Sequence, residues 1–353
     1  MPVDRGIIAA LGAAALFGAS TPLAKILTHA TAPLLLSGLL YLGSGLGLAL
    51  LLGLRRMSNR REALSWPHGV ELGWLLVAIG LGGGVAPYLL MYGLRLTDSA
   101  SASLILNLEG VLTALLAWFV FRENFDRRIA AGMGLIIAGG LVLSAGPALR
   151  ASGFIGPLAI AGACLGWAID NNVTRKVSAY DAMSIACAKG LVAGGVSVAL
   201  ALGGGARLPA MAVCVQAGLL GFMSYGISLT LFVVALRQLG TARTGAYFSL
   251  APFMGASLAV VLGAPMTITL VAAAILMGCG VWLHLTEHHS HWHRHEPLRH
   301  EHGHVHDEHH RHSHGPDWQG DEPHAHVHDH EPLEHEHVHF PDTHHRHDHQ
   351  QVK

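Results

Sequence analysis

GLRLTDSASASLILNLEGVLTALLAWFVF, residues 93–121, and ALRQLGTARTGAYFSLAPFMGASLAVVLG, residues 235–263, align without gaps at an offset of 142. Leu94, Arg95, Ala100, Leu108 and Ala117 recur as Leu236, Arg237, Ala242, Leu250 and Ala259. A weaker match places LFGASTPLAK (16–25) over GWAIDNNVTR (166–175), and a basic residue closes each segment. The chain is therefore predicted to contain a duplication, although apolar segments can also align through composition alone.

Ten apolar segments are long enough to cross a bilayer, whose core requires about 20 residues of helix. They are 6–28, 33–54, 69–94, 99–121, 128–146, 153–174, 181–202, 211–236, 242–262 and 267–286. Because each half holds an odd number of them, the second half is predicted to enter the membrane upside down relative to the first. The predicted fold is an all-α integral membrane protein of ten transmembrane helices, arranged as two inverted five-helix repeats (1–149 and 150–286) and followed by a tail (287–353).

Basic residues in the short connections predict the orientation. Twelve share the side of the N-terminus: Arg5, Arg55, Arg56, Arg60, Arg61, Arg122, Arg127, Arg128, Arg175, Lys176, Arg237 and Arg243. Only Arg95, Arg150 and Arg207 lie in the connections on the other side. Since cytoplasmic connections carry the excess of Lys and Arg, both termini are predicted to be cytoplasmic, in a multi-pass protein of the plasma (inner) membrane.

The duplicated pattern, with LILNLEGVLTALLAWFVFREN (104–124) after a short polar turn, resembles the EamA-type branch of the drug/metabolite transporter superfamily. In that family the run usually contains Leu-Glu-Pro, then an aliphatic stretch and a Gly-Glu pair. Here Gly110 replaces the proline and Arg122 replaces the glycine, while the second copy keeps Pro252 but has Ala251 in place of the glutamate. The resemblance covers about residues 6–286 and implies ten helices, cytoplasmic termini and secondary transport, commonly export of small solutes.

Ionisable residues at membrane depth are costly and tend to serve function. Glu109, near the middle of the fourth segment, is the first candidate for a coupling or cation-binding residue, and Asn107 lies beside it in the sequence. Lys189, near mid-depth in the seventh segment, is expected to pair with Glu109 or Asp170, because an unpaired ammonium is expensive there. Asp170 and Asn171 lie toward the cytoplasmic end of the sixth segment, where they could line an inward-facing vestibule.

Structural alternatives remain open for the same residues. Lys189 could simply neutralise Glu109, and the Asp-Asn-Asn run at 170–172 could be a hydrated helix end. In the third segment, GLGGGVAP (80–87) permits close approach of backbones, although Gly and Pro are common in membrane helices generally.

The tail has a different composition from the rest of the chain. It contains 24 of the 27 histidines, 14 Asp and Glu, and 5 Lys and Arg. Because it has few large apolar side chains, it is predicted to be disordered without metal. Repeated His-x-His spacing is typical of a metal-binding tract, and imidazole suits several transition metals. Alternatives are pH sensing and low-complexity drift without function.

The candidate metal ligands form two groups. The first is expected on one face of an extended last helix, and the second lies in the His-x-His runs of the tail. They are His284, His288 and His291, and then His302, His304, His306, His326, His328 and His330.

Two functions remain open. In the first, the tail collects Ni, Co or Zn and the membrane body exports the ion. The high density of histidines in the tail narrowly favours this hypothesis. In the second, the body exports small organic metabolites or drugs, and the tail buffers or senses metal. Against the first, segments one to nine contain no histidine at mid-membrane depth. A membrane-anchored metal buffer without transport is disfavoured, because ten spans are excessive for an anchor.

Other classes of function lack a signal. The sequence contains no P-loop, dinucleotide fingerprint or nucleophile elbow, so an enzyme is not expected and no cofactor is required. A basic nucleic-acid surface is also absent. The expected partners are the lipid bilayer and a small solute or metal ion, and the oligomeric state is open, with a homodimer as one option.

Overall fold

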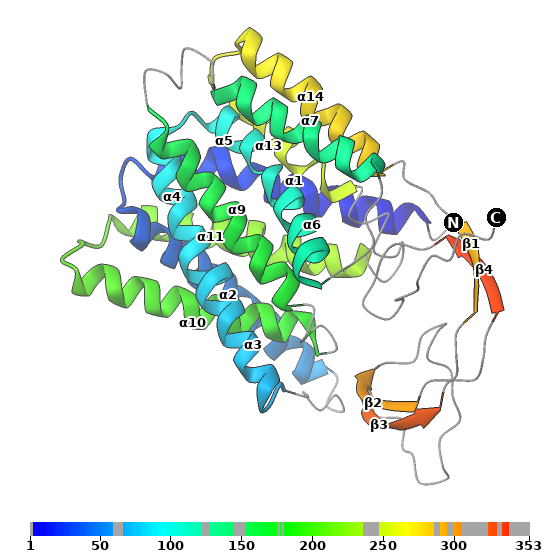
Figure 1. The fold of residues 1–353 in the computed structure, drawn as a ribbon. Helices are drawn as coiled ribbons and strands as arrows, with labels where there is room; N and C mark the ends of the chain where they lie inside the picture. Colours follow the sequence, from blue (N-terminus) through cyan, green and yellow to red (C-terminus); the bar gives the residue numbers. More distant parts are fainter. Residues whose placement is uncertain are drawn as a thin grey trace.

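The computed structural model describes residues 3–58, 66–121, 127–144, 153–174, 177, 180–235, 247–285, 290–294, 299–304, 324–329 and 334–338. Up to residue 285 its regular secondary structure is helical (Figure 1). Five helices there are long and apolar enough to cross a membrane: Arg5–Leu27, Pro33–Arg55, Val70–Leu96, Met183–Gly203 and Met211–Ala235. Shorter apolar helices cover Ala130–Leu143, Ala251–Val261 and Ile268–Leu283. The all-helical body agrees with the predicted fold, and the total of ten spans stays a prediction.

In the first half, the predicted segments become helices with local interruptions. They are α1 (Val3–Leu27), α2 (Pro33–Ser58), α3 (Val70–Ala78), the π-helix η1 (Ile79–Val85), α4 (Ala86–Leu96), α5 (Ser99–Ile105), α6 (Leu108–Phe121) and α7 (Arg127–Ser144). The third segment is thus a single rod of α3, η1 and α4. The fourth, expected to be one helix over 99–121, is instead divided between α5 and α6 by a turn at Leu106 and Asn107.

The second half shows the same plan. Its elements are α9 (Ile155–Thr174), α10 (Ala182–Gly203), α11 (Met211–Gly221), the π-helix η3 (Phe222–Ile227), α13 (Ala251–Val261) and α14 (Ile268–Leu285). The helix that contains η3 continues to Ala235, while 236–246, where the ninth expected segment begins, lies outside the described residues. Asp181 starts α10 by accepting a hydrogen bond from the backbone N–H of Ser184 at 2.8 Å, as an N-cap does.

The two π-helices occupy corresponding positions in the halves. Adding the repeat offset of 142 to residues 79–85 of η1 gives 221–227, and η3 covers 222–227. A π-helical turn has one extra residue, and such turns are frequent at functional sites. The duplication seen in the sequence therefore extends to the local backbone geometry of the third helix in each half.

Corresponding helices of the two halves also pack against each other in opposite directions. In α2 and α10, Gly38 lies against Gly194, whereas Gly45 lies against Gly190. The residue numbers rise along one helix as they fall along the other, so the helices are antiparallel. Glycines at these positions allow the two backbones to come into contact. This arrangement is the one expected of an inverted repeat.

The remaining helix contacts follow the same two-fold relation. The last helices of the halves, α7 and α14, are antiparallel as well, because Gly139 lies against Ala273 and Gly280 lies against Gly132. The first helix of the second half, α9, packs on α4 and α6, and its counterpart α1 packs on η3 and α13. Figure 1 shows α9 crossing the middle of the body beside α4 and α6.

Four short strands are described in the tail. They are β1 (Ser290–Arg294), β2 (Arg299–His304), β3 (His324–Asp329) and β4 (Glu334–Val338). β1 pairs with β4 and β2 pairs with β3, both antiparallel (Figure 1). At these positions the structure differs from the predicted disordered tail. The reason is that His-x-His alternation has the two-residue period of a strand.

The strands also change the placement of the candidate metal ligands. His284 lies in α14, which ends at Leu285, whereas His291 lies in β1, so the expected site on one extended helix is not formed. His302 and His304 lie in β2, and His326 and His328 lie in β3. His288, His306 and His330 lie outside the described residues.

Candidate functional site

A buried ion pair joins α9 to α10. Nζ of Lys189 lies 2.6 Å from both carboxylate oxygens of Asp170, and the two side chains are only 16% and 9% exposed. Oγ1 of Thr174 also donates to Oδ1 of Asp170, at 2.8 Å. Of the two partners expected for Lys189, the structure selects Asp170. The pair is neutral as a unit, which lowers the cost of placing both groups within the membrane.

Glu109 is held by a neutral group instead. Nδ2 of Asn171 in α9 donates to Oε1 of Glu109 at 2.9 Å, and the same amide lies 3.5 Å from Oγ1 of Thr113. Within the described part of the chain, no cation pairs with Glu109. The structural alternative in which Lys189 neutralises Glu109 is therefore wrong. Glu109 lies in the first turn of α6, where the helix dipole favours a negative charge.

The break between α5 and α6 positions Glu109. The backbone N–H of Asn107 donates to the carbonyl of Leu104, three residues earlier, at 3.0 Å, and the side-chain amide of Asn107 donates to the same oxygen at 3.0 Å. Sγ of Cys164 lies 3.8 Å from the carbonyl of Ile105. Groups of the protein thus satisfy backbone carbonyls that the break exposes, as a membrane interior requires. Asn107 stabilises the break and is not part of the contact between Glu109 and Asn171.

The carbonyl of Gly82 in η1 is a second polar centre beside the ion pair. It accepts hydrogen bonds from the hydroxyl of Tyr41 at 2.8 Å and from Nε1 of Trp167 at 3.0 Å. Gly82 packs so closely on Asp170 that a Cβ at this position would lie 2.0 Å from Oδ2. Tyr41 is near enough to Asp170 and Glu109 to interact with both electrostatically. The polar groups of α2, η1, α6, α9 and α10 therefore converge on one region of the body.

Aromatic rings connect this region to the second half. The ring of Tyr41 lies 5.5 Å from that of Tyr225 in η3, and Tyr225 lies 6.0 Å from Phe17 of α1. Phe17 lies 5.4 Å from Phe248, which lies 4.8 Å from Phe232. Tyr41 thus binds a carbonyl of one π-helix and packs on a ring of the other. Sequence reasoning missed these aromatics, because they are isolated residues far apart in the chain. For η1 the sequence signal was the glycine-rich run GLGGGVAP (80–87).

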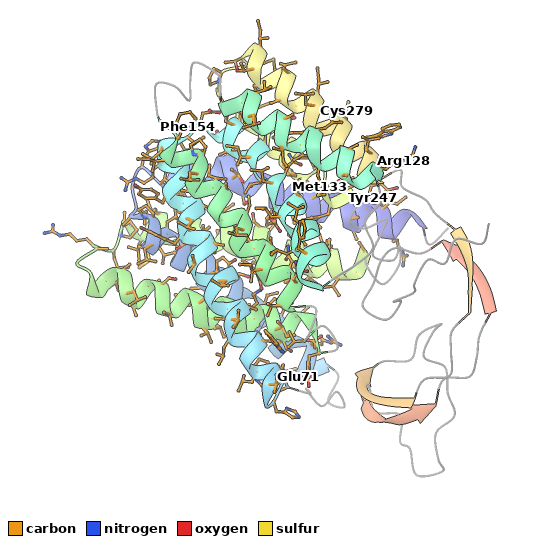
Figure 2. The ribbon with its side chains drawn as sticks, in the orientation of Figure 1. Glu71, Arg128, Met133, Phe154, Tyr247 and Cys279 are labelled. Carbon is orange, nitrogen blue, oxygen red and sulfur yellow. The ribbon has the colours of Figure 1, made fainter. Side chains whose placement is uncertain are left out.

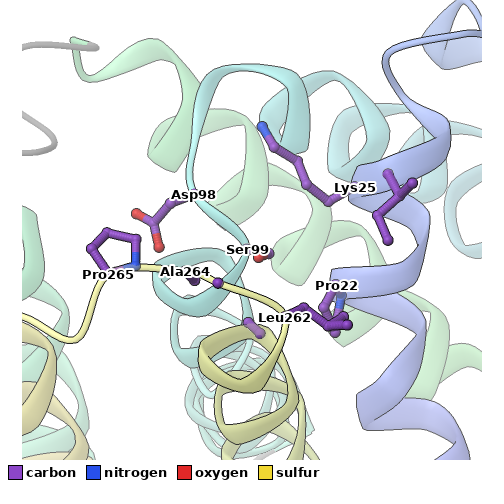
Figure 3. A pocket seen from close by; sticks show the side chains of 10 residues that line it. Pro22, Lys25, Asp98, Ser99, Leu262, Ala264 and Pro265 are labelled. Carbon is purple, nitrogen blue, oxygen red and sulfur yellow. The ribbon is translucent and has the colours of Figure 1, made fainter.

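A separate cavity of about 300 Å³ lies between α1, α5 and the segment that follows α13. Figure 3 shows Lys25, Asp98, Pro22 and Pro265 around it. Nζ of Lys25 donates to the carbonyl of Leu94, and Asp98 caps α5. Both charged groups are thus engaged within the protein, and the cavity lining includes none of the residues of the polar region described above.

Another polar contact lies where α3 begins. The hydroxyl of Tyr180 donates to Oε2 of Glu71, and this hydrogen bond raises the pKa of Tyr180 to about 12. Figure 2 places Glu71 and Phe154 at opposite ends of the helical body. The contact therefore joins the first turn of α3 to the residue that precedes the cap of α10, at one end of the body.

No metal centre is found in the helical body as far as it is described. Among the side chains that the structure describes, no group of three or more His, Cys, Asp and Glu residues is arranged to hold an ion. Cys164 and Asp170 are engaged by a backbone carbonyl and by Lys189, respectively.

Comparison with known protein families gives two matches, which lie on either side of the boundary between the two internal repeats. The EamA-like transporter family matches residues 4–145 and again residues 154–286. The chain belongs to the EamA-like transporter family. It is thus a multi-pass membrane transporter of the drug/metabolite superfamily rather than an enzyme, and its partners include the bilayer and a small solute.

Individual relatives agree with this assignment. An uncharacterized transporter of Methanothermobacter thermautotrophicus is 28% identical over 293 residues, which cover 79% of this chain and 85% of the relative. Two proteins described as probable 4-amino-4-deoxy-L-arabinose-phosphoundecaprenol flippase subunits ArnE match shorter stretches. The one from Pseudomonas fluorescens is 42% identical over 88 residues (25% of this chain, 75% of the relative), and the one from Pseudomonas paraeruginosa is 35% identical over 99 residues (26% and 84%).

A solved crystal structure shares the fold. It superposes with a TM-score of 0.57 at 21% sequence identity, and the match covers 80% of this chain and 94% of the other.

Proposed function

We propose that this EamA-like transporter exports a small organic solute that carries a positive charge, and that Glu109 exchanges the solute for a proton. The observation that carries the proposal is the contrast between the two carboxyl groups of the polar region. Lys189 neutralises Asp170, whereas among the described side chains Glu109 is held by the neutral amide of Asn171. A carboxylate without a cation at membrane depth favours either a proton or a cationic ligand.

The surroundings of Glu109 suit an organic cation. Tyr41 lies within electrostatic range of Glu109, and its ring begins the series of aromatic contacts that continues through Tyr225 to Phe17. Aromatic faces attract ammonium groups, most strongly where water is scarce. The ArnE relatives are named for an amino sugar attached to a lipid, so an amine is also part of their named substrate.

The proposal also includes a direction of transport and an orientation of the chain in the membrane. The basic residues of the connections support cytoplasmic termini in the plasma membrane. With this orientation, a proton that enters down its gradient can drive a cation outward, as in antiport. The two π-helices η1 and η3, at corresponding positions of the inverted halves 1–149 and 150–286, are the candidates for the segments that adjust when the site changes sides.

Metal export is the second candidate, because the tail carries 24 histidines. It is weaker, since the described side chains of the body contain no group of three metal ligands. A dehydrated transition metal requires several such ligands at each step. The homodimer stays a prediction, and neither proposal depends on it.

Inside-out membrane vesicles that contain the full chain can test the proposal. After a pH gradient is formed, addition of a transported cation should release protons, which a pH-sensitive dye reports. The probes are tetraphenylphosphonium, ethidium, a neutral sugar, and Ni²⁺, Co²⁺ or Zn²⁺. Glu109→Gln is compared with Glu71→Gln, which makes the same chemical change at the contact with Tyr180.

Proton release by an organic cation that disappears in Glu109→Gln and persists in Glu71→Gln supports the proposal. Equal activity of the two variants would contradict it. Proton release by the metals alone would favour metal export instead, and a response to the neutral sugar alone would show that the positive charge is not recognised.

A further inference from the structure

The register of the tail strands aligns histidine with histidine. In the β2–β3 pair, the facing residues are His300 and His328, His302 and His326, and His304 and His324. In the β1–β4 pair, they are His291 and His337, and His293 and His335. Every histidine in these four strands therefore has another histidine at the facing position. The candidate ligands thus come from segments that are distant in the sequence.

This arrangement matches the requirements of a transition-metal site. Alternate residues of a strand lie on the same face, so two successive facing pairs place four histidines on one face of the strand pair. Directly opposite residues have Cβ atoms roughly 5 Å apart. Zn²⁺ binds four ligands in a tetrahedron, with nitrogen at about 2.0 Å. We propose that the β2–β3 pair and the β1–β4 pair each form a four-histidine site for a divalent transition metal.

The topology gives the metal a structural role. An isolated two-stranded sheet is marginally stable in water. Here the strands are also joined by long connections, 305–323 between β2 and β3 and 295–333 between β1 and β4, whose closure costs entropy. An ion bound by residues of both strands supplies the missing cross-link, so metal binding and strand pairing are one equilibrium.

This proposal differs from metal binding by composition. Composition assigns equal weight to all His-x-His runs of the tail, whereas the register selects particular partners. It adds His293, His300, His324, His335 and His337 to the candidates. It is also independent of the transport site, because all the histidines of the two strand pairs lie after α14.

Neighbour exchanges that conserve composition can test the proposal in the full chain in lipid nanodiscs. Exchanging Ala325 with His326 removes both His-x-His spacings of β3, and exchanging Glu301 with His302 does the same in β2. The matched control exchanges His312 with Ser313, which removes two such spacings in the segment between these strands. Tightly bound Zn²⁺ per chain is measured by competition with a chromophoric chelator, and Ni²⁺ is tested in the same way.

The proposal expects two tightly bound ions per chain in the wild type, one for each strand pair. Each exchange in β2 or β3 should remove one tightly bound ion, because the affinity of that site for the metal falls at least tenfold. Even the loss of an outer-shell partner lowers metal affinity by about 10–100-fold. The double exchange should remove no more than either single exchange, because both strands form the same site. The control should keep both ions. Equal losses in the control and in β3, additive losses in the double exchange, or no loss at all would each overturn the proposal.

Discussion

Replacement of Gly82 by alanine perturbs the contact between η1 and the buried ion pair. The added Cβ would lie 2.0 Å from Oδ2 and 2.2 Å from Cγ of Asp170. Because ordinary contact begins near 3.4 Å, the oxygen would have to retreat by about 1.4 Å. Nζ of Lys189 lies 2.6 Å from both oxygens, so a shift of this size stretches or breaks at least one of these hydrogen bonds.

The expected loss of stability follows from the crowding. Excess volume in a packed interior costs about 1–3 kcal/mol, and a weakened ion pair adds to this cost. We expect Gly82→Ala to lower the free energy of unfolding by at least about 1–3 kcal/mol. The control is Gly80→Ala in the same π-helix, where a Cβ would have nothing within 4 Å. There alanine should be neutral or stabilising by up to about 1 kcal/mol, because it favours the helix.

Both variants can be compared with the wild type by reversible unfolding in mixed micelles of increasing SDS content, followed by tryptophan fluorescence. The measured quantity is the difference between the two free energies of unfolding. If Gly82→Ala is as stable as Gly80→Ala, then Asp170 does not pack on Gly82, and the placement of the ion pair beneath η1 is refuted.

Asp170→Asn should lower the free energy of unfolding by about 3–5 kcal/mol, because it leaves Lys189 buried and unpaired. Adding Lys189→Met to this variant should restore part of the lost stability in the same assay. If nothing is restored, the pairing of Lys189 with Asp170 is contradicted. Glu71→Gln should return the pKa of Tyr180 from about 12 toward its usual 10, as measured by phenolate absorbance against Tyr180→Phe. Since this pKa is raised in the folded chain, the contact stabilises fully below pH 10, and its contribution is lost as the pH rises through 12. Asp98→Ala should lower the free energy of unfolding by about 1 kcal/mol in the same assay, because it removes the N-cap of α5. Asp98→Asn should leave this free energy nearly unchanged, because asparagine can also cap a helix. Equal effects of the two substitutions would show that Asp98 is not a cap.

The apolar pattern alone determined most helix positions. The odd number of segments in each half predicted an inverted second half, and the antiparallel course of α2 and α10 agrees with that prediction. The predicted segments 33–54 and 181–202 correspond to α2 (Pro33–Ser58) and α10 (Ala182–Gly203). These properties are local, because hydropathy, length and capping residues act within one segment. The break at Leu106 and Asn107 was missed, because the apolar run continues through it and the groups that satisfy its carbonyls include Cys164 of another helix.

Only the tertiary structure decided which polar groups meet. Asp170 and Asn171 are neighbours in the sequence, yet one contacts Lys189 of α10 and the other contacts Glu109 of α6. Consecutive residues of a helix point about 100° apart, so the rotation of α9 between its neighbours selects the partner of each. The hydrogen bonds from Tyr41 and Trp167 to the carbonyl of Gly82 depend in the same way on the packing of three helices.

In the tail, too, the sequence determines some properties and the tertiary structure determines others. Its His-x-His alternation contains the two-residue period of a strand, which is a property of the sequence. Which histidine faces which depends on the pairing of strands separated by long connections, and the pattern would allow several registers. Short-range periodicity therefore determined what each segment of this chain can become, whereas long-range packing decided which residues of different segments meet.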